Sequence, residues 1–304
     1  MNSDLYVTSD AKKQLTDILA SFTDYSSKHL PDDVVKRLKE LSEAEHSEFA
    51  RIIYDAMFEN MDMADRLDRP VCQDTGLVQY FVRVGTSFSY MEVIEEALRD
   101  AVLKATVSAP LRHNAVEVFD ERNTGTNIGH HVPWIEWELV PNWDEIEIFM
   151  YMAGGGCSLP GMAKVLMPLE GYEGIVKFVF DRVTTLGINA CPPLLVGVGI
   201  AGSAEVASKL SKKALLRPIG SVSTNPRGAM LERQIRDGLD AVGIGPGGLT
   251  GAGSVMAVHI EHAARHPATL AVGISTGCWA HRRSKIRINS KLEYEVLSHQ
   301  GVTL

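Results

Sequence analysis

Four cysteines provide the most reactive side chains of this 304-residue sequence, and no two of them are spaced for a short-range metal motif. Cys72, Cys191 and Cys278 stand in three distant segments, each flanked by residues typical of loops. Thiols so far apart in the chain converge only if the fold brings their loops together. Three thiolates on one iron–sulfur cluster would leave one iron open to a substrate.

A cysteine taken alone is more often a small buried hydrophobe than a metal ligand. The neighbours of these three cysteines favour ligation instead. Cys72 precedes the polar, turn-prone string Gln-Asp-Thr-Gly, Cys191 precedes two prolines, and Cys278 follows Gly277. Thiols held on exposed turns are suited to reactivity or metal binding.

A glycine-rich segment at residues 153–161 follows a predicted strand and contains Gly154, Gly155 and Gly156. Such a loop lets a ligand approach the backbone, and its successive N–H groups can bind an anion. It matches neither the dinucleotide-binding nor the P-loop pattern. Cys157, the fourth cysteine, lies in this loop, and its sequence context leaves open whether it is a ligand.

Two further side chains could contact a substrate. Arg112 lies in a predicted loop, and its guanidinium could bind a carboxylate through two hydrogen bonds. His266 precedes a proline between two predicted strands and could orient or protonate a substrate. Taken alone, an arginine or histidine in such a loop is more often a solvated surface residue. The ten histidines form no evident zinc-binding pattern.

The candidate site residues must be positioned by the helices and strands around them. The sequence pattern of these elements predicts an α+β fold with one continuous core. A helical N-terminal layer is expected over residues 1–68, its first helix capped by Ser9 or Asp10, and a mixed helix and sheet core over 69–304. Helices are predicted at residues 9–20, from 31, and at 43–65, 91–107, 174–186, 203–216 and 226–242. Strands are predicted at 77–84, 135–140, 145–151, 194–200, 255–260 and 270–274.

Composition excludes several classes of protein. The net charge of −8 argues against a nucleic-acid-binding protein, which would carry a basic patch. The first residues show no signal-peptide pattern, so none is expected, and no apolar run reaches membrane-spanning length. Four cysteines are too few for a disulfide scaffold, so a cytoplasmic protein with reduced thiols is expected.

Four motifs occur in an order that resembles the alpha part of the class I, iron–sulfur-dependent fumarase and tartrate dehydratase family. They are Cys-Gln-Asp-Thr-Gly at 72–76, the three glycines at 154–156, Asn-Ala-Cys-Pro-Pro at 189–193 and Gly-Cys at 277–278. The similarity covers nearly the whole chain. Gly-Gly-Gly-Cys-Ser-Leu-Pro-Gly and Ser-Thr-Gly-Cys-Trp-Ala-His-Arg-Arg resemble the tartrate dehydratase branch.

The resemblance implies a single hydro-lyase alpha domain that holds a [4Fe-4S] cluster with one open iron. Its cluster ligands would be Cys72, Cys191 and Cys278. Single-chain fumarases of the family have serine at the place of Cys157, so Cys157 is not expected to be a ligand. Gln73, Asp74, Arg112 and the loop Gly154, Gly155, Gly156 match substrate contacts. Asp74 and His266 would be the catalytic residues of this chain.

The implied reaction removes water from a small hydroxydicarboxylate, and for tartrate the enol product becomes oxaloacetate. An open iron would bind the departing hydroxyl as a Lewis acid, and Arg112 would hold a carboxylate. Asp74 would orient or assist a base.

Family members also need a beta portion with a catalytic threonine, which this sequence does not show. We therefore expect a separate beta subunit, in an assembly of two alpha and two beta chains. A two-subunit class I fumarate hydratase and a non-catalytic metal-binding or iron-sensing protein remain alternatives.

Overall fold

A computed structural model describes residues 2–304 of the chain, with side chains from residue 9 onward. Met1, the first residue of the predicted domain, lies outside the described residues. The chain forms two compact units. Unit 1 contains the residues up to Asp32, Asn60–Gly154 and Arg282–Leu304, and unit 2 contains Asp33–Glu59 and Gly155–His281. The α+β class is confirmed, but each unit has its own hydrophobic core where one continuous core was predicted.

Three helices open the chain: α1 (Asn2–Lys28), α2 (Asp32–Glu43) and α3 (Glu48–Leu67). Residues 33–59 of this stretch belong to unit 2 and the rest to unit 1. The predicted cap at Ser9 or Asp10 is wrong, because α1 runs through both residues. Local cap preference is weak beside tertiary packing. Here α1 buries an apolar stripe in the core of unit 1 through Ala11, Leu15, Leu19 and Phe22.

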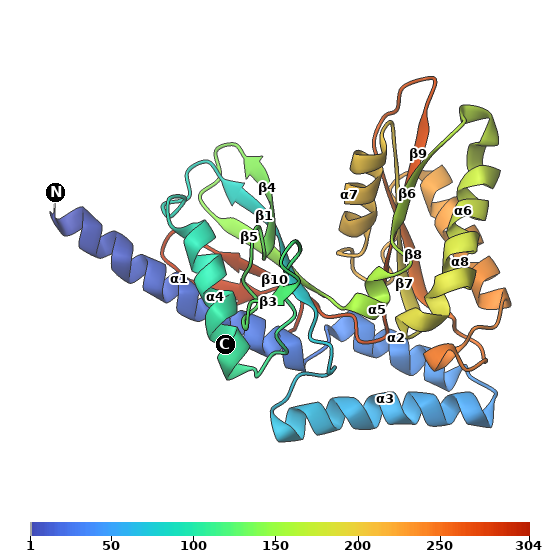
Figure 1. The fold of residues 1–304 in the computed structure, drawn as a ribbon, viewed down its shortest axis with the longest axis horizontal. Helices are drawn as coiled ribbons and strands as arrows, with labels where there is room; N and C mark the ends of the chain where they lie inside the picture. The colour runs from blue at the N-terminus through green and yellow to red at the C-terminus, as the bar shows by residue number, and fades with distance from the viewer. Residues whose placement is uncertain (1) are drawn as a thin grey trace. The chain divides into compact units, whose positions relative to one another are not determined.

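Unit 1 is built on a five-stranded mixed sheet (Figure 1). Its strand order is β11 (Tyr294–Val296), β10 (Arg283–Ile288), β5 (Ile146–Ala153), β1 (Leu77–Gly85) and β4 (Trp134–Val140). Alternate residues of β1, β5 and β10 join α1 and α4 (Ile94–Ser108) in one core. The intervening residues of these three strands point their side chains to the opposite face of the sheet, as the two-residue period of a strand requires.

That opposite face carries a row of alternating charges across all five strands. Glu138, Arg83, Glu147, Arg287 and Glu295 are neighbours in register from β4 to β11. Glu147 is 3% exposed and lies at the centre, where Arg83 and Arg287 donate to its two carboxylate oxygens at 3.0 and 2.8 Å. Burial opposes its ionisation, but hydrogen bonds from Arg287 and Lys285 outweigh burial and lower the pKa of Glu147.

Unit 2 is built on a four-stranded mixed sheet. Its strand order is β6 (Met162–Leu166), β9 (Leu270–Gly277), β7 (Leu194–Ala201) and β8 (Val255–His262). On one face α6 (Gly171–Leu186) and α8 (Pro226–Ala241) pack to form the core, and α7 (Ala204–Ala214) covers the other face (Figure 1).

Glycines in β7 let α7 lie directly on the sheet. A Cβ at Gly199 would collide with the carbonyl oxygen of Ala207, and one at Gly197 with that of Ser211. The facing positions of α7 are themselves small and buried. This backbone-to-backbone packing fixes β7, whose first residue follows the Cys191 loop.

The remaining elements are short. They are β2 (Val116–Glu117), β3 (Arg122–Asn123), α5 (Gly155–Ser158), η1 (Pro168–Glu170), η2 (Gly187–Ala190) and η3 (Pro246–Gly248). The predicted helices and strands are present, whereas the strands β2, β3, β6, β10 and β11 were not predicted. None of the described helices is long and apolar enough to cross a membrane.

We predict that Glu147→Gln lowers the free energy of unfolding at neutral pH by about 1–3 kcal/mol, because three cations lose their shared buried carboxylate. A carboxyl with a lowered pKa stabilises the fold above its unfolded value of 4.5, and that contribution is lost as pH falls. Denaturant unfolding at pH 7 and at pH 3 should therefore show the two proteins converging in acid.

The matched control is Glu138→Gln at the outer end of the row, where the side chain is 49% exposed. It should cost less than about 1 kcal/mol. Equal losses at the two positions, or a gap between wild type and Glu147→Gln that persists in acid, would contradict the assigned role of Glu147.

Candidate active site

In unit 1 the Gln73–Asp74 turn is fixed by hydrogen bonds around Asp74. One carboxylate oxygen of Asp74 accepts from the N–H of Gly76 at 3.0 Å and from Asn114 Nδ2 at 3.3 Å. The same Asn114 amide donates to the carbonyl of Gly76 at 3.1 Å. Arg282, only 2% exposed, donates to the carbonyl of Asp74 at 2.8 Å. Backbone and carboxylate of Asp74 are therefore held at the same time.

The Arg112 loop is tied to the same turn. Thr75 Oγ1 donates to the carbonyl of Arg112 at 3.4 Å, while the Arg112 side chain is exposed. Gly76 has a φ of 76°, and a Cβ there would lie 2.7 Å from the carbonyl carbon of Ala153, just before Gly154. Unit 1 thus brings together the segments that carry Gln73, Asp74, Arg112 and Gly154, all predicted substrate contacts, beside Cys72.

In unit 2 the loops of Cys191 and Cys278 meet at one end of the sheet. Cys191 lies just before β7 and Cys278 just after β9, and these strands are antiparallel neighbours. The N–H of Trp279 donates to the carbonyl of Cys191 at 3.0 Å. Cys191 is exposed and has a left-handed backbone with φ 55°, and Cys278 is half-buried.

The second half of the glycine loop lies at the same end of unit 2. Thr276 Oγ1 donates to the carbonyl of Cys157 at 2.5 Å. A Cβ at Gly156 would come within 3.3 Å of the carbonyl of Asn189, in the segment that leads to Cys191. Cys157 itself is 6% exposed and belongs to the hydrophobic core. Burial lowers the pKa of the nearby Lys212. The electrostatic interaction with Cys157 acts in the opposite direction and raises that pKa, but it is the smaller effect.

These observations bear on whether the thiols fit an iron–sulfur cluster. None of the four described cysteines forms a disulfide. Two of the three predicted ligands, Cys191 and Cys278, stand on adjacent loops with accessible side chains, and Cys157 is the buried one. Among the described residues, no three His, Cys, Asp or Glu side chains form a ready metal-ion site. Unit 2 therefore fits two thiolate ligands, while Cys72 belongs to unit 1.

His266 lies at the other end of the unit 2 sheet from these thiols. It is exposed on the turn between β8 and β9, where its Nδ1 accepts from the N–H of Ala268 at 3.1 Å. Strand β9, Leu270–Gly277, separates this turn from Cys278. Seven residue steps of a strand span about 24 Å. Within one chain, His266 is therefore not brought together with Cys191 and Cys278.

Sequence reasoning missed the residues that hold the site rather than contact a ligand. Asn114 and Arg282 support Asp74, and Thr276 supports the carbonyl of Cys157. All three stand in runs that also contain predicted site residues or cluster ligands. Their roles depend on contacts between distant segments, such as the 208 residues that separate Arg282 from Asp74.

Comparison with known proteins gives one family. The sequence profile described as "Fumarate hydratase (Fumerase)" matches residues 16–287. The chain is 58% identical over 289 residues to "L(+)-tartrate dehydratase subunit alpha" of Escherichia coli (strain UTI89 / UPEC), covering 95% of each chain. The protein of the same name from Escherichia coli (strain K12) is 57% identical over 289 residues, with the same coverage.

A more distant relative extends the comparison to another organism. The protein described as "Putative L(+)-tartrate dehydratase subunit alpha" of Methanocaldococcus jannaschii is 37% identical over 284 residues. The match covers 92% of this chain and 100% of the relative.

The burial of the cysteines in unit 2 predicts an order of thiol reactivity. In metal-free, folded protein, iodoacetamide should label exposed Cys191 at least about tenfold faster than buried Cys157, because a buried thiol must wait for local opening. Peptide mass spectrometry of timed samples measures both rates, and labelling in denaturant serves as the control in which they converge. Equal rates in the folded protein would contradict the described burial.

Proposed function

Because this chain belongs to the fumarate hydratase family, we propose that it is the alpha subunit of an L(+)-tartrate dehydratase. The reaction would remove water from tartrate and yield oxaloacetate. The observation that carries the proposal is the 58% identity to the Escherichia coli alpha subunit over 95% of both chains. The related alternative, a two-subunit fumarate hydratase, would use the same residues on a different hydroxy acid.

We propose that Cys72, Cys191 and Cys278 hold a [4Fe-4S] cluster. The accessible thiols of Cys191 and Cys278 on adjacent loops support this, as does the burial of Cys157 away from that role. The proposal requires unit 1 to supply the third thiolate through Cys72. When bound, the cluster would supply a Lewis-acidic iron for the departing hydroxyl.

The chain's own residues would then hold and orient the substrate. The exposed Arg112 guanidinium can take a carboxylate through two parallel hydrogen bonds. The N–H groups of Gly154, Gly155 and Gly156 can bind a second carboxylate without side-chain obstruction. Asp74 is fixed by Asn114 and Arg282, so its carboxylate and the neighbouring Gln73 amide would present a rigid surface to the substrate hydroxyls.

His266 would act at the site of a second alpha chain. Its own sheet keeps it about 24 Å from the thiols of the same chain, so the resemblance that assigns it a substrate contact requires another copy. An assembly with two alpha chains satisfies that requirement. The names of the relatives, which are alpha subunits, support a beta partner that would provide the remaining catalytic groups.

The ligand set predicts the outcome of four substitutions. Cys72→Ser, Cys191→Ser and Cys278→Ser should each lose the cluster's visible absorbance and most of the bound iron after anaerobic purification. Cys157→Ser is the matched control and should retain both. Iron, sulfide and zinc analysis makes the measurement. A cluster lost only in Cys157→Ser, or zinc in place of iron in the wild type, would exclude the proposed cofactor site.

The substrate is tested with the alpha chain and its beta partner together. We expect kcat/KM for L(+)-tartrate to exceed that for malate by at least about tenfold, because a site that hydrogen-bonds a second hydroxyl rejects an analogue without it. The alpha chain alone should show negligible dehydration. Preference for malate and fumarate would favour the fumarate hydratase alternative, and full activity without the beta chain would disprove the shared site.

A further inference from the structure

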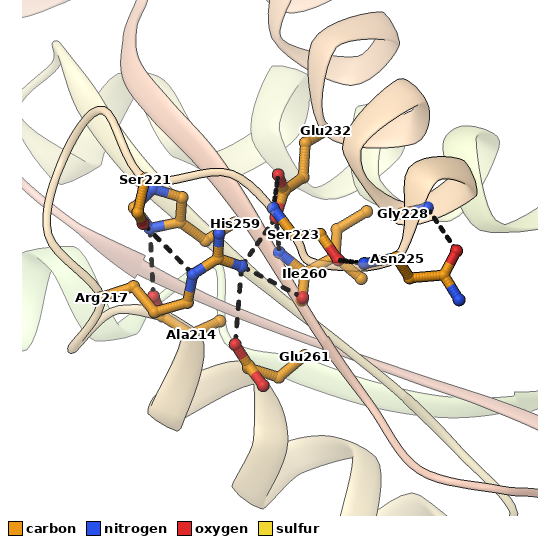
Figure 2. A network of polar contacts seen from close by, with 10 residues as sticks. All are labelled: Ala214, Arg217, Ser221, Ser223, Asn225, Gly228, Glu232, His259, Ile260 and Glu261. Atoms are coloured by element: carbon orange, nitrogen blue, oxygen red, sulfur yellow. Dashed lines mark hydrogen bonds and ion pairs between the residues drawn. The ribbon is translucent and has the colours of Figure 1, made fainter.

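Side chains satisfy much of the outer edge of the unit 2 sheet, which is the free side of β8. The N–H of Ile260 donates to Glu232 at 2.8 Å, and the carbonyl of Ile260 accepts from Arg217 at 3.2 Å. Earlier in the strand, the carbonyl of Met256 accepts from Arg37 at 3.0 Å. Figure 2 shows Arg217 and Glu232 beside the backbone of Ile260. These contacts block the positions at which another strand could pair.

Val258 is the gap in this edge. Alternate residues of a strand in a parallel pair turn their N–H and carbonyl to the same side. The two backbone groups of Val258 therefore point outward, like those of Met256 and Ile260. Among the described residues, no group bonds to either of them from that side, although Val258 is only 4% exposed. Buried backbone groups are almost always paired, so water or a ligand must complete them.

Val258 lines a cavity of about 250 Å³ between α2, α8 and the loop at residues 219–222. We call it the β8 cavity, and all of its lining residues belong to unit 2. Small-molecule sites commonly have volumes of about 300–1,000 Å³. The β8 cavity lies just below that range, so it suits a molecule of a few carbon atoms and is too small for a dinucleotide.

The β8 cavity is rich in positive charge, in a chain whose net charge is −8. Four cations line it: Lys36, Arg37, Arg233 and Arg236. Arg37 and Arg236 form ion pairs with neighbouring carboxylates at 3.2 and 2.7 Å. In the part of the chain that the structure describes, Lys36 and Arg233 form no ion pair, and both side chains are exposed. Two positive charges, one on α2 and one on α8, are therefore left for a ligand.

The carboxylates in the lining are already engaged. Glu232 is 4% exposed, and both of its oxygens accept hydrogen bonds: Arg217 donates to one at 2.7 Å and the N–H of Ser223 to the other at 2.8 Å (Figure 2). Asp33 accepts from a backbone N–H at 2.6 Å. Because Glu232 is paired with a cation outside the lining, its charge does not neutralise Lys36 or Arg233.

We propose that the β8 cavity binds a small phosphate monoester that also carries a hydroxyl group. Such a phosphate has nearly two negative charges at neutral pH, which match Lys36 and Arg233. Ser221 lines the cavity, and its Oγ accepts from Arg217 at 3.3 Å, so its hydrogen can be donated to a phosphate oxygen. The ligand hydroxyl would donate to the carbonyl of Val258, and the N–H of Val258 would donate to a ligand oxygen.

The proposal is tested by isothermal titration calorimetry of the full chain with glycerol 3-phosphate. We expect binding that weakens as sodium chloride is raised, because exposed charges are screened. The double variant Lys36→Ala with Arg233→Ala should bind at least about tenfold more weakly. The matched control, Lys39→Ala with Arg227→Ala, removes the same two charges from exposed positions of the same helices outside the cavity and should bind like wild type.

Two further measurements test the other half of the ligand. Propyl phosphate, which has no hydroxyl, should bind at least about tenfold more weakly, because the carbonyl of Val258 stays unpaired. Glycerate, with one negative charge, should also bind more weakly than glycerol 3-phosphate. Hydrogen exchange in peptides that cover residues 255–260 should slow with glycerol 3-phosphate, since the N–H groups of Val255 and Ile260 are already bonded and that of Val258 gains a partner.

Several outcomes would each overturn the proposal. They are absence of binding by glycerol 3-phosphate, equal affinity in the cavity variant and its control, glycerate or propyl phosphate binding as tightly as glycerol 3-phosphate, and unchanged exchange at residues 255–260. None of these measurements needs tartrate turnover, so the proposed function and the β8 cavity stand or fall separately.

Discussion

The two thiol loops of unit 2 are joined by a backbone hydrogen bond, from the N–H of Trp279 to the carbonyl of Cys191. It closes the end of two antiparallel strands and sets two reactive thiols on adjacent loops. The strands themselves are fixed from beneath by α7, which lies so close that Gly197 and Gly199 have no room for a Cβ. Accurate placement of the thiol loops therefore begins with residues that have no chemistry of their own.

In unit 1, polar contacts rather than close backbone packing hold the Asp74 turn in place. Asp74 is held through its carboxylate by Asn114 and through its carbonyl by the buried Arg282. A turn restrained at both groups loses little further entropy when a ligand binds. Polar contacts also restrain the five-stranded sheet of unit 1. Glu147 accepts hydrogen bonds from Arg83 and Arg287 on the two neighbouring strands, which favours a single strand register.

Much of this could be read from the sequence. Periodicity located the long helices and the central strands, because their apolar residues repeat at intervals that packing reinforces. It did not find β6, whose exposed Met162 and Val165 lack a buried alternating face, nor β10, whose start is a run of basic residues. The Ser9 cap failed because tertiary burial of Leu15 and Leu19 outweighed a local preference. Contacts such as Arg282 with Asp74 join segments that no local pattern relates.

The chain passes between its two units four times, at residues 32–33, 59–60, 154–155 and 281–282. Two of these passages interrupt functional motifs, one inside the three-glycine loop and one within the run after Cys278. Neither unit is thus a continuous stretch of gene. A break at any single point would therefore divide at least one unit, so neither unit can be cut from this chain as one continuous segment.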